Sequence, residues 1–167
     1  RLTVPWAPVL GLDFQLRMDG FAWLFAMLVA GMGTLVVLYA RYYMSADDPV
    51  PRFFSFFLAF MGAMLGVVLS GNLIQLAMFW ELTSLSSFLL IGYWKHLPEG
   101  RQGARMALTV TGAGGLAMIA GMLILGDIAG SYNLTDILQH KEAIQASPLY
   151  VPALVLILAG CFTKSAQ

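Results

Sequence analysis

The sequence predicts an all-α integral membrane protein with about five transmembrane helices, the last of them truncated. Of its 167 residues, 59% are hydrophobic and 11% are charged, whereas soluble domains carry about 25% charged residues. The mean hydropathy is +0.78, and the apolar residues gather in runs that each approach the roughly 20 residues a helix needs to cross a bilayer. Membrane strands would require alternating segments of about ten residues, and the sequence has none.

The predicted helices follow the apolar runs. They span about residues 21–41, 53–70, 73–94, 104–127 and 149–167. Charged residues and prolines mark 41–52 and 95–105 as loops, and "SGN" at 70–72 predicts a tight turn.

Two further stretches are predicted to lie outside the bilayer. Near the start, apolar residues alternate with others from Leu12 to Met18, which predicts a short strand or hairpin. The stretch 130–148 contains an amphipathic segment, about 134–146, which we expect to lie flat at the interface and to be capped by Thr135. Its apolar face is predicted to hold Leu134, Ile137, Leu138 and Ile144.

The ends of the sequence predict an internal fragment of a longer protein. The first residue is Arg1, and "GCFTKSAQ" stops inside a pattern that should continue. We expect residues 1–167 to form part of a membrane domain that does not work alone.

Basic residues predict the orientation of the helices. The loops 41–52 and 95–105 hold most of the arginines and lysines. Under the positive-inside rule these loops are cytoplasmic, and the 130–148 segment faces outward.

Glu81 is the first anomaly, because a carboxylate stands near the middle of an apolar run. It lies about 12 Å deep, at 1.5 Å per residue from the 70–72 turn. A charge at the bilayer centre costs about 2.5–3.5 kcal/mol on insertion scales, and such residues usually face a bundle interior or a water-filled cavity. The alternative is a protonated carboxyl that bonds a neighbouring helix. Thr83, Ser84 and Ser87 follow as possible supporting groups, although intramembrane hydroxyls also act as ordinary helix contacts.

Lys164 is the second anomaly. It stands about 22 Å into the last apolar run, so it would be intramembrane if the helix continued past Gln167. The alternative is a lysine that snorkels at a helix end. In neighbouring helices, a glutamate and a lysine can exchange protons through water.

Glycines predict close helix contacts. Gly62 and Gly66 form a GxxxG motif in the second run. The fourth run contains a further set: Gly112, Gly114, Gly115 and Gly121.

Several classes of function are not expected. The formal net charge is zero, so no nucleic-acid partner is predicted. The sequence has no nucleotide-binding loop, no metal-ligand cluster and no nucleophile–base motif. We therefore predict no catalytic residues, no cofactor and no metal.

The long stretch "RFFSFFLAFMGAMLGVVLSGNLIQLAMFWELTSLSSFLLIGYW" contains the specific motif "WELTSLSSFLLIG". With it, and with "MDGFAWLF", "VVLYARYYMS" and "GCFTKSAQ", the sequence resembles the large A subunit of Mrp-type multisubunit cation/proton antiporters. That family is similar to the antiporter-like subunits of respiratory complex I. The resemblance implies a transporter subunit rather than an enzyme.

The resemblance implies an antiporter-like helix bundle and roles for two residues. Glu81 occupies the place of the family's intramembrane glutamate, and Lys164 that of its lysine on a broken helix. Together they imply a charged pair in a proton or cation half-channel. The family's later charged residues and its second half-channel would lie beyond Gln167. Gly71 departs from the family pattern, because many relatives carry an acidic residue there.

Three hypotheses follow. The first is a subunit of a multisubunit sodium (or other monovalent cation)/proton antiporter in the inner membrane of a bacterium, with other antiporter subunits and the lipid bilayer as partners. The second is a proton-pumping subunit of an NADH:quinone oxidoreductase, and "LTSLSSF" favours the antiporter over it. The third, a passive scaffold, leaves Glu81 and Lys164 unexplained.

Overall fold

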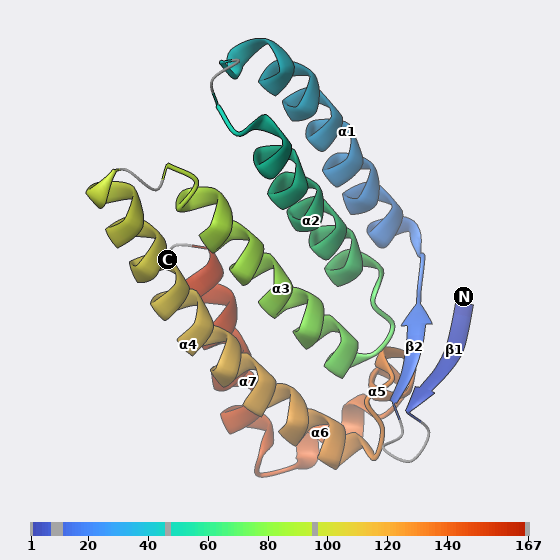
Figure 1. The fold of residues 1–167 in the computed structure, drawn as a ribbon. Helices are drawn as coiled ribbons and strands as arrows, with labels where there is room; N and C mark the ends of the chain where they lie inside the picture. The colour runs from blue at the N-terminus through green and yellow to red at the C-terminus, as the bar shows by residue number, and fades with distance from the viewer. Residues whose placement is uncertain (1, 8–11, 46–47, 95–96, 166–167) are drawn as a thin grey trace.

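The computed structural model describes residues 2–7, 12–45, 48–94 and 97–165, and these form a bundle of long helices with a small hairpin at one end (Figure 1). The elements, in chain order, are β1 (Leu2–Ala7), β2 (Leu12–Leu16), α1 (Gly20–Tyr43), α2 (Val50–Leu69), α3 (Leu73–Ile91), α4 (Pro98–Ala129), α5 (Leu134–Gln139), α6 (Lys141–Ala146) and α7 (Tyr150–Lys164). Within these residues, α1 to α4 are long and apolar enough to cross a membrane, and α7 is a shorter apolar helix. The predicted fold class is confirmed.

Polar residues set the ends of the helices. The Asp19 carboxylate accepts a hydrogen bond from the Ala22 N–H at the start of α1, and this bond holds the pKa of Asp19 below its usual range. Asn72 caps α3 by accepting from the N–H groups of Ile74 and Gln75. Gly130 ends α4 with a φ of 69°, a left-handed conformation that glycine adopts without a Cβ penalty.

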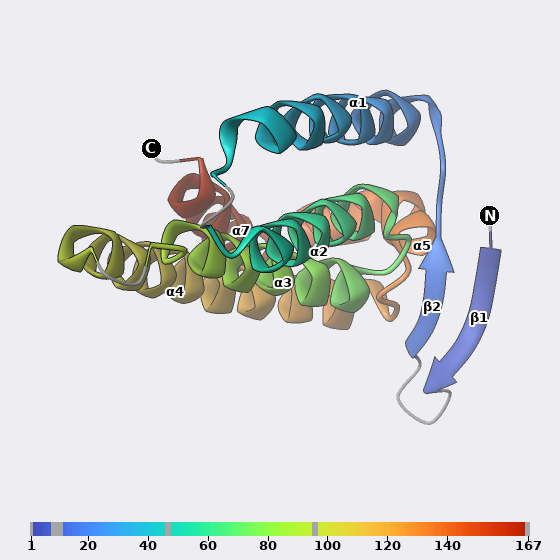
Figure 2. The ribbon, with the colours of Figure 1, turned by 45° about the horizontal axis from the view of Figure 1, so that its top comes forward.

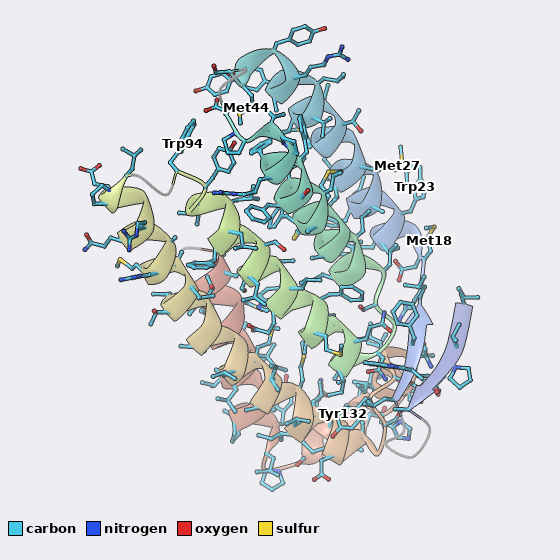
Figure 3. The ribbon with its side chains drawn as sticks, viewed as in Figure 1. Met18, Trp23, Met27, Met44, Trp94 and Tyr132 are labelled. Atoms are coloured by element: carbon cyan, nitrogen blue, oxygen red, sulfur yellow. The ribbon has the colours of Figure 1, made fainter. Side chains whose placement is uncertain are left out.

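The helices pack as a row that turns back on itself. α2 packs against α3, α3 packs against α4, and α4 packs most extensively against α7. Among the described helices, α1 makes appreciable contact with α2 alone. Figure 2 shows α1 standing off from the other helices. Its outer side presents Trp23 and Met27, which point away from the bundle in Figure 3. The buried core lies instead between α3, α4 and the short helices, and its members are Leu73, Ala77, Met118, Met122, Ile137 and Ile144.

The N-terminal hairpin is hydrogen-bonded to the N-terminal end of α3. β1 and β2 pair antiparallel, as the alternating pattern predicted a strand or hairpin. The buried Gln75 side chain accepts from the Gln15 N–H at 2.8 Å and donates to the Gln15 carbonyl at 3.0 Å. The backbone of the α2–α3 turn adds two bonds. The Gly71 N–H donates to the same carbonyl, and the Leu134 N–H donates to the Gly71 carbonyl. We call this set of bonds, from Gln15 through Gly71 to Leu134, the hairpin clasp.

Some element boundaries differ from the prediction. α4 begins at Pro98, so most of the predicted 95–105 loop is helical, while residues 95 and 96 lie outside the described part. The reason is that Pro98 starts a helix as a first-turn proline, and the polar residues after it are helical beyond the apolar span. The 134–146 stretch forms α5 and α6. Thr135 does not cap, because α5 begins at Leu134 after Asn133. Ile137 and Ile144 are buried, but Leu138 is 59% exposed.

The glycine predictions are right for some positions and wrong for others. A Cβ at Gly66 would overlap Phe79, and one at Gly121 would come within 2.8 Å of the Ala153 carbonyl. Gly62 and Gly112 have no atom within 4 Å of such a Cβ among the described residues, so they do not mark close contacts here. The spacing identifies a small-residue face, but a neighbouring helix need not lie on it.

Candidate functional site

Glu81 lies at the middle of α3 and faces α4. Its carboxyl group packs against Gly115, close enough that a Cβ at this position would overlap the Glu81 Oε1 atom. Gly115 is itself near the middle of α4, and the adjacent Gly114 is in equally close contact with Thr163 of α7. Two neighbouring glycines on α4 therefore let α3 and α7 approach at the level of the carboxylate.

The Glu81 carboxyl group is only partly satisfied. Its Oε1 atom is buried and has no hydrogen-bond partner among the described residues. Glu81 also borders a groove of about 550 Å³ between α3 and the hairpin, whose walls are largely apolar and include Trp6, Phe14 and Phe79. The carboxylate thus lies between the helix packing on one side and an open groove on the other.

Lys164 reaches the same level from α7. Its Nζ atom donates a hydrogen bond to the Ser84 Oγ at 2.8 Å and lies 5.5 Å from the centre of the Trp80 ring. Both partners are on α3, so the lysine crosses from the end of one helix to the middle of another. A cation at a helix C-terminus is also favourable to the helix dipole. The contact with Ser84, however, directs this cation toward α3 rather than toward solvent.

Ser84 bonds Lys164 and lies one turn from Glu81. It follows Glu81 by three positions, so the two side chains are neighbours on one face of α3. Each charge acts electrostatically on the other. Within the described residues, however, no carboxylate oxygen of Glu81 lies within 4 Å of Lys164, and the ion pair found there joins Arg17 to Asp19.

The other hydroxyl residues differ in what they do. Thr83 is buried and donates to the Trp80 carbonyl at 2.6 Å. Ser87 is half-buried. Ser86 is buried and donates to the Leu82 carbonyl. The sequence analysis missed Trp80 as the ring beneath Lys164, which its position four residues before Ser84 would have indicated.

No metal-binding cluster is present in the described part of the chain, because it contains no group of three histidine, cysteine, aspartate or glutamate side chains close enough to hold an ion. The chemistry of the site is therefore that of a carboxylate, an ammonium group and hydroxyl groups between apolar helices.

Two protein families match the chain. The family described as NADH:quinone oxidoreductase/Mrp antiporter, TM, matches residues 70–167. The family described as NADH-Ubiquinone oxidoreductase (complex I), chain 5 N-terminus, matches residues 6–54.

Related proteins agree with these matches. The chain is 65% identical over 164 residues to the A/B subunit of a probable K⁺/H⁺ antiporter of Rhizobium meliloti, covering 98% of this chain and 16% of that protein. It is 46% identical over 166 residues to the A subunit of the Na⁺/H⁺ antiporter of Alkalihalophilus pseudofirmus, covering 99% of this chain and 21% of that protein. The chain thus spans about a fifth of the length of these relatives.

Solved structures share the fold. A chain in the structure of the Mrp complex from Dietzia sp. DQ12-45-1b superposes with a TM-score of 0.93 at 34% identity, covering 99% of this chain and 18% of that one. The archaeal membrane-bound sulfane sulfur reductase superposes with a TM-score of 0.76 at 23% identity, covering 94% of this chain and 31% of that one, which shows the fold alone. The helices are therefore those of an antiporter-like membrane protein. The chain belongs to the NADH:quinone oxidoreductase/Mrp antiporter family, and its sequence is similar to the A subunit of Na⁺/H⁺ antiporters.

Proposed function

We propose that the full-length protein is a subunit of a multisubunit monovalent cation/proton antiporter, and that this segment supplies part of its ion half-channel. The observation that carries the proposal is that Lys164 of α7 bonds Ser84, one turn from Glu81 on α3, at mid-helix depth. The buried Oε1 atom of Glu81 has no hydrogen-bond partner among the described residues, and ionisable groups at this depth in a membrane are costly and mark functional sites. The relatives named as antiporter subunits support the cation/proton reaction.

The geometry supports a switch of the lysine between two partners. Lys164 has a flexible four-carbon stem and ends a helix, whereas Glu81 and Ser84 are fixed one turn apart on α3. We infer that the ammonium group bonds Ser84 in one state and the Glu81 carboxylate in another. When the ammonium group moves from Glu81 to Ser84, the Glu81 carboxylate loses its countercharge and takes up a proton. When the ammonium group returns to Glu81, it favours release of that proton.

The proposed reaction is tested in everted vesicles that contain the full-length complex. We expect that adding sodium chloride to vesicles with an acidic interior makes protons leave, which a pH-sensitive dye reports as recovery of its fluorescence. Potassium chloride is the parallel arm, because the relatives are named for different cations. Vesicles from cells lacking the complex are the control. If neither cation moves protons, the antiporter proposal fails.

A second candidate is the proton-translocating arm of a membrane-bound redox complex. The matching family includes NADH:quinone oxidoreductase as well as Mrp antiporters, which favours it. This candidate requires that NADH and a quinone, rather than a cation gradient, drive proton movement in the same vesicles.

The orientation is proposed from the basic loops. We place the 41–52 and 95–105 loops in the cytoplasm of a bacterial cell, and the 130–148 segment, which holds α5 and α6, outside the inner membrane. Cysteines introduced at Glu99 and Gln139, both exposed, test this in a full-length protein without other cysteines. An impermeant thiol reagent should label Gln139→Cys in intact cells and label Glu99→Cys only after the cells are opened. The opposite pattern would reverse the assignment.

A further inference from the structure

Three arginines line one pocket, at the end of the bundle where α2 begins and α3 ends. The pocket has a volume of about 480 Å³, and no carboxylate is among the described residues that line it. The residues that matter here are the arginines and the apolar wall between them: Arg52, Arg101, Arg105, Phe56, Phe88 and Leu89. We call this the arginine pocket.

The position of the arginine pocket along α4 fits the level of the lipid headgroups. α4 has 32 residues and is about 48 Å long, whereas the hydrocarbon core is about 30 Å thick. α4 is therefore longer than the hydrocarbon requires, and its polar first turns, with Arg101 and Arg105, are the part suited to the interface. Tyr42, Tyr43 and Trp94 are exposed at the same end, and Trp94 is seen there beside the end of α3 in Figure 3. Exposed tyrosine and tryptophan side chains are typical of the membrane interface.

Among the described residues, the three arginines of the pocket have no acidic side chain as an ion-pair partner. Arg52 donates to the Tyr93 carbonyl at 2.8 Å and lies over the Phe56 and Tyr93 rings, but its Nε atom is buried and unpartnered among the described residues. In the part of the chain that the structure describes, no carboxylate lies within 4 Å of the guanidinium groups of Arg52, Arg101 or Arg105. Arg101 and Arg105 are one turn apart, so both guanidinium groups serve the same face of α4.

We propose that the arginine pocket binds the phosphate group of an anionic phospholipid, whose acyl chains lie along the apolar wall. Guanidinium groups match phosphate oxygens with paired N–H donors. Basic pockets between membrane helices on the cytoplasmic side are suited to anionic headgroups. The combination of three cations with Phe56, Phe88 and Leu89 fits a ligand that is charged at one end and apolar at the other. This site is separate from Glu81 and does not depend on the transport reaction.

The test uses the purified full-length complex and native mass spectrometry with added dioleoylphosphatidylglycerol. The variant is Arg101→Gln/Arg105→Gln, because both residues are exposed on the first turns of α4 and their loss should leave the fold intact. Arg41→Gln is the matched control, since Arg41 is exposed at the same end but does not line the pocket. We expect phosphatidylglycerol affinity to fall about fivefold for each pocket arginine removed and to be unchanged in Arg41→Gln.

Two further arms identify the ligand. Dioleoylphosphatidylcholine should bind the parent and the double variant equally, and inorganic phosphate in excess should not displace phosphatidylglycerol. Equal losses in the double variant and in Arg41→Gln would mean general surface charge and overturn the site. Displacement by inorganic phosphate would mean a free anion site. Unchanged lipid binding with a lower unfolding temperature in the double variant would mean that the arginines pair with a carboxylate elsewhere in the protein, which also overturns the proposal.

Discussion

Replacing Glu81 by glutamine in the full-length protein should reduce cation-dependent proton flux by about 100-fold, the low end of what a positioned proton-transfer group contributes. Glutamine has the same shape and also fits against Gly115, so packing, expression and assembly of the complex should persist. What is lost is the titratable oxygen pair beside Ser84 and Lys164. The measurement is proton flux in vesicles, normalised to the amount of assembled complex.

Two controls separate a proton carrier from a structural carboxyl group. Glu81→Asp should retain part of the flux, because the carboxylate survives on a shorter stem. Lys164→Met should impair flux by itself, and the double variant Glu81→Gln/Lys164→Met should be little worse than either single variant, because groups that act as a unit are not additive. Near-normal flux from Glu81→Gln would leave Glu81 as a hydrogen-bonding residue in helix packing and end its proposed role.

A single methyl group on α4 should have the second largest effect. In Gly115→Ala the new Cβ would occupy the place of the Glu81 Oε1 atom, so the carboxyl group or the whole of α3 must move. Overpacking of this kind costs about 1–3 kcal/mol, which corresponds to a flux about 5–150-fold lower if the cost falls on the active arrangement.

The chain offers a matched control for this substitution. Gly112→Ala lies on the same helix, one turn away, and its Cβ meets no atom of the described residues within 4 Å. Both changes alter helix propensity equally, so flux should be lost in Gly115→Ala and kept in Gly112→Ala. Equal flux in the two variants would show that the packing of Glu81 against Gly115 has no role in transport.

Much of the fold and both charged residues could be predicted from the sequence because they are anomalies against an apolar background. Glu81 and Lys164 stand out where lipid disfavours charge, and apolar runs of membrane length define the helices. The start of α4 could not be predicted in this way. The polar residues after Pro98 indicate a segment exposed to water. Such a segment can be a helix as readily as a loop, so its composition does not decide between them.

The contacts between side chains of different helices could not be predicted from the sequence. Ser84 and Ser87 are equivalent by composition, and only the packing of α7 on α4 selects Ser84 as the partner of Lys164. Gly115 and Gly112 are likewise equivalent by composition. A glycine in the sequence indicates that a neighbour could approach closely, but it does not indicate which side chain does so. Small-residue spacing therefore found the right helix but not the functional position on it.

The hairpin clasp has a consequence for biogenesis. It joins Gln15 in the hairpin to Gln75 and Gly71 around the α2–α3 turn, and then to Leu134 after α4. In a chain made from its N-terminus, Gln15 is synthesised long before Leu134. The last bond of the clasp, from the Leu134 N–H to the Gly71 carbonyl, therefore cannot form until the fourth long helix has been made. The hydrogen bonds that hold the start of α3 are completed only at that late stage of synthesis.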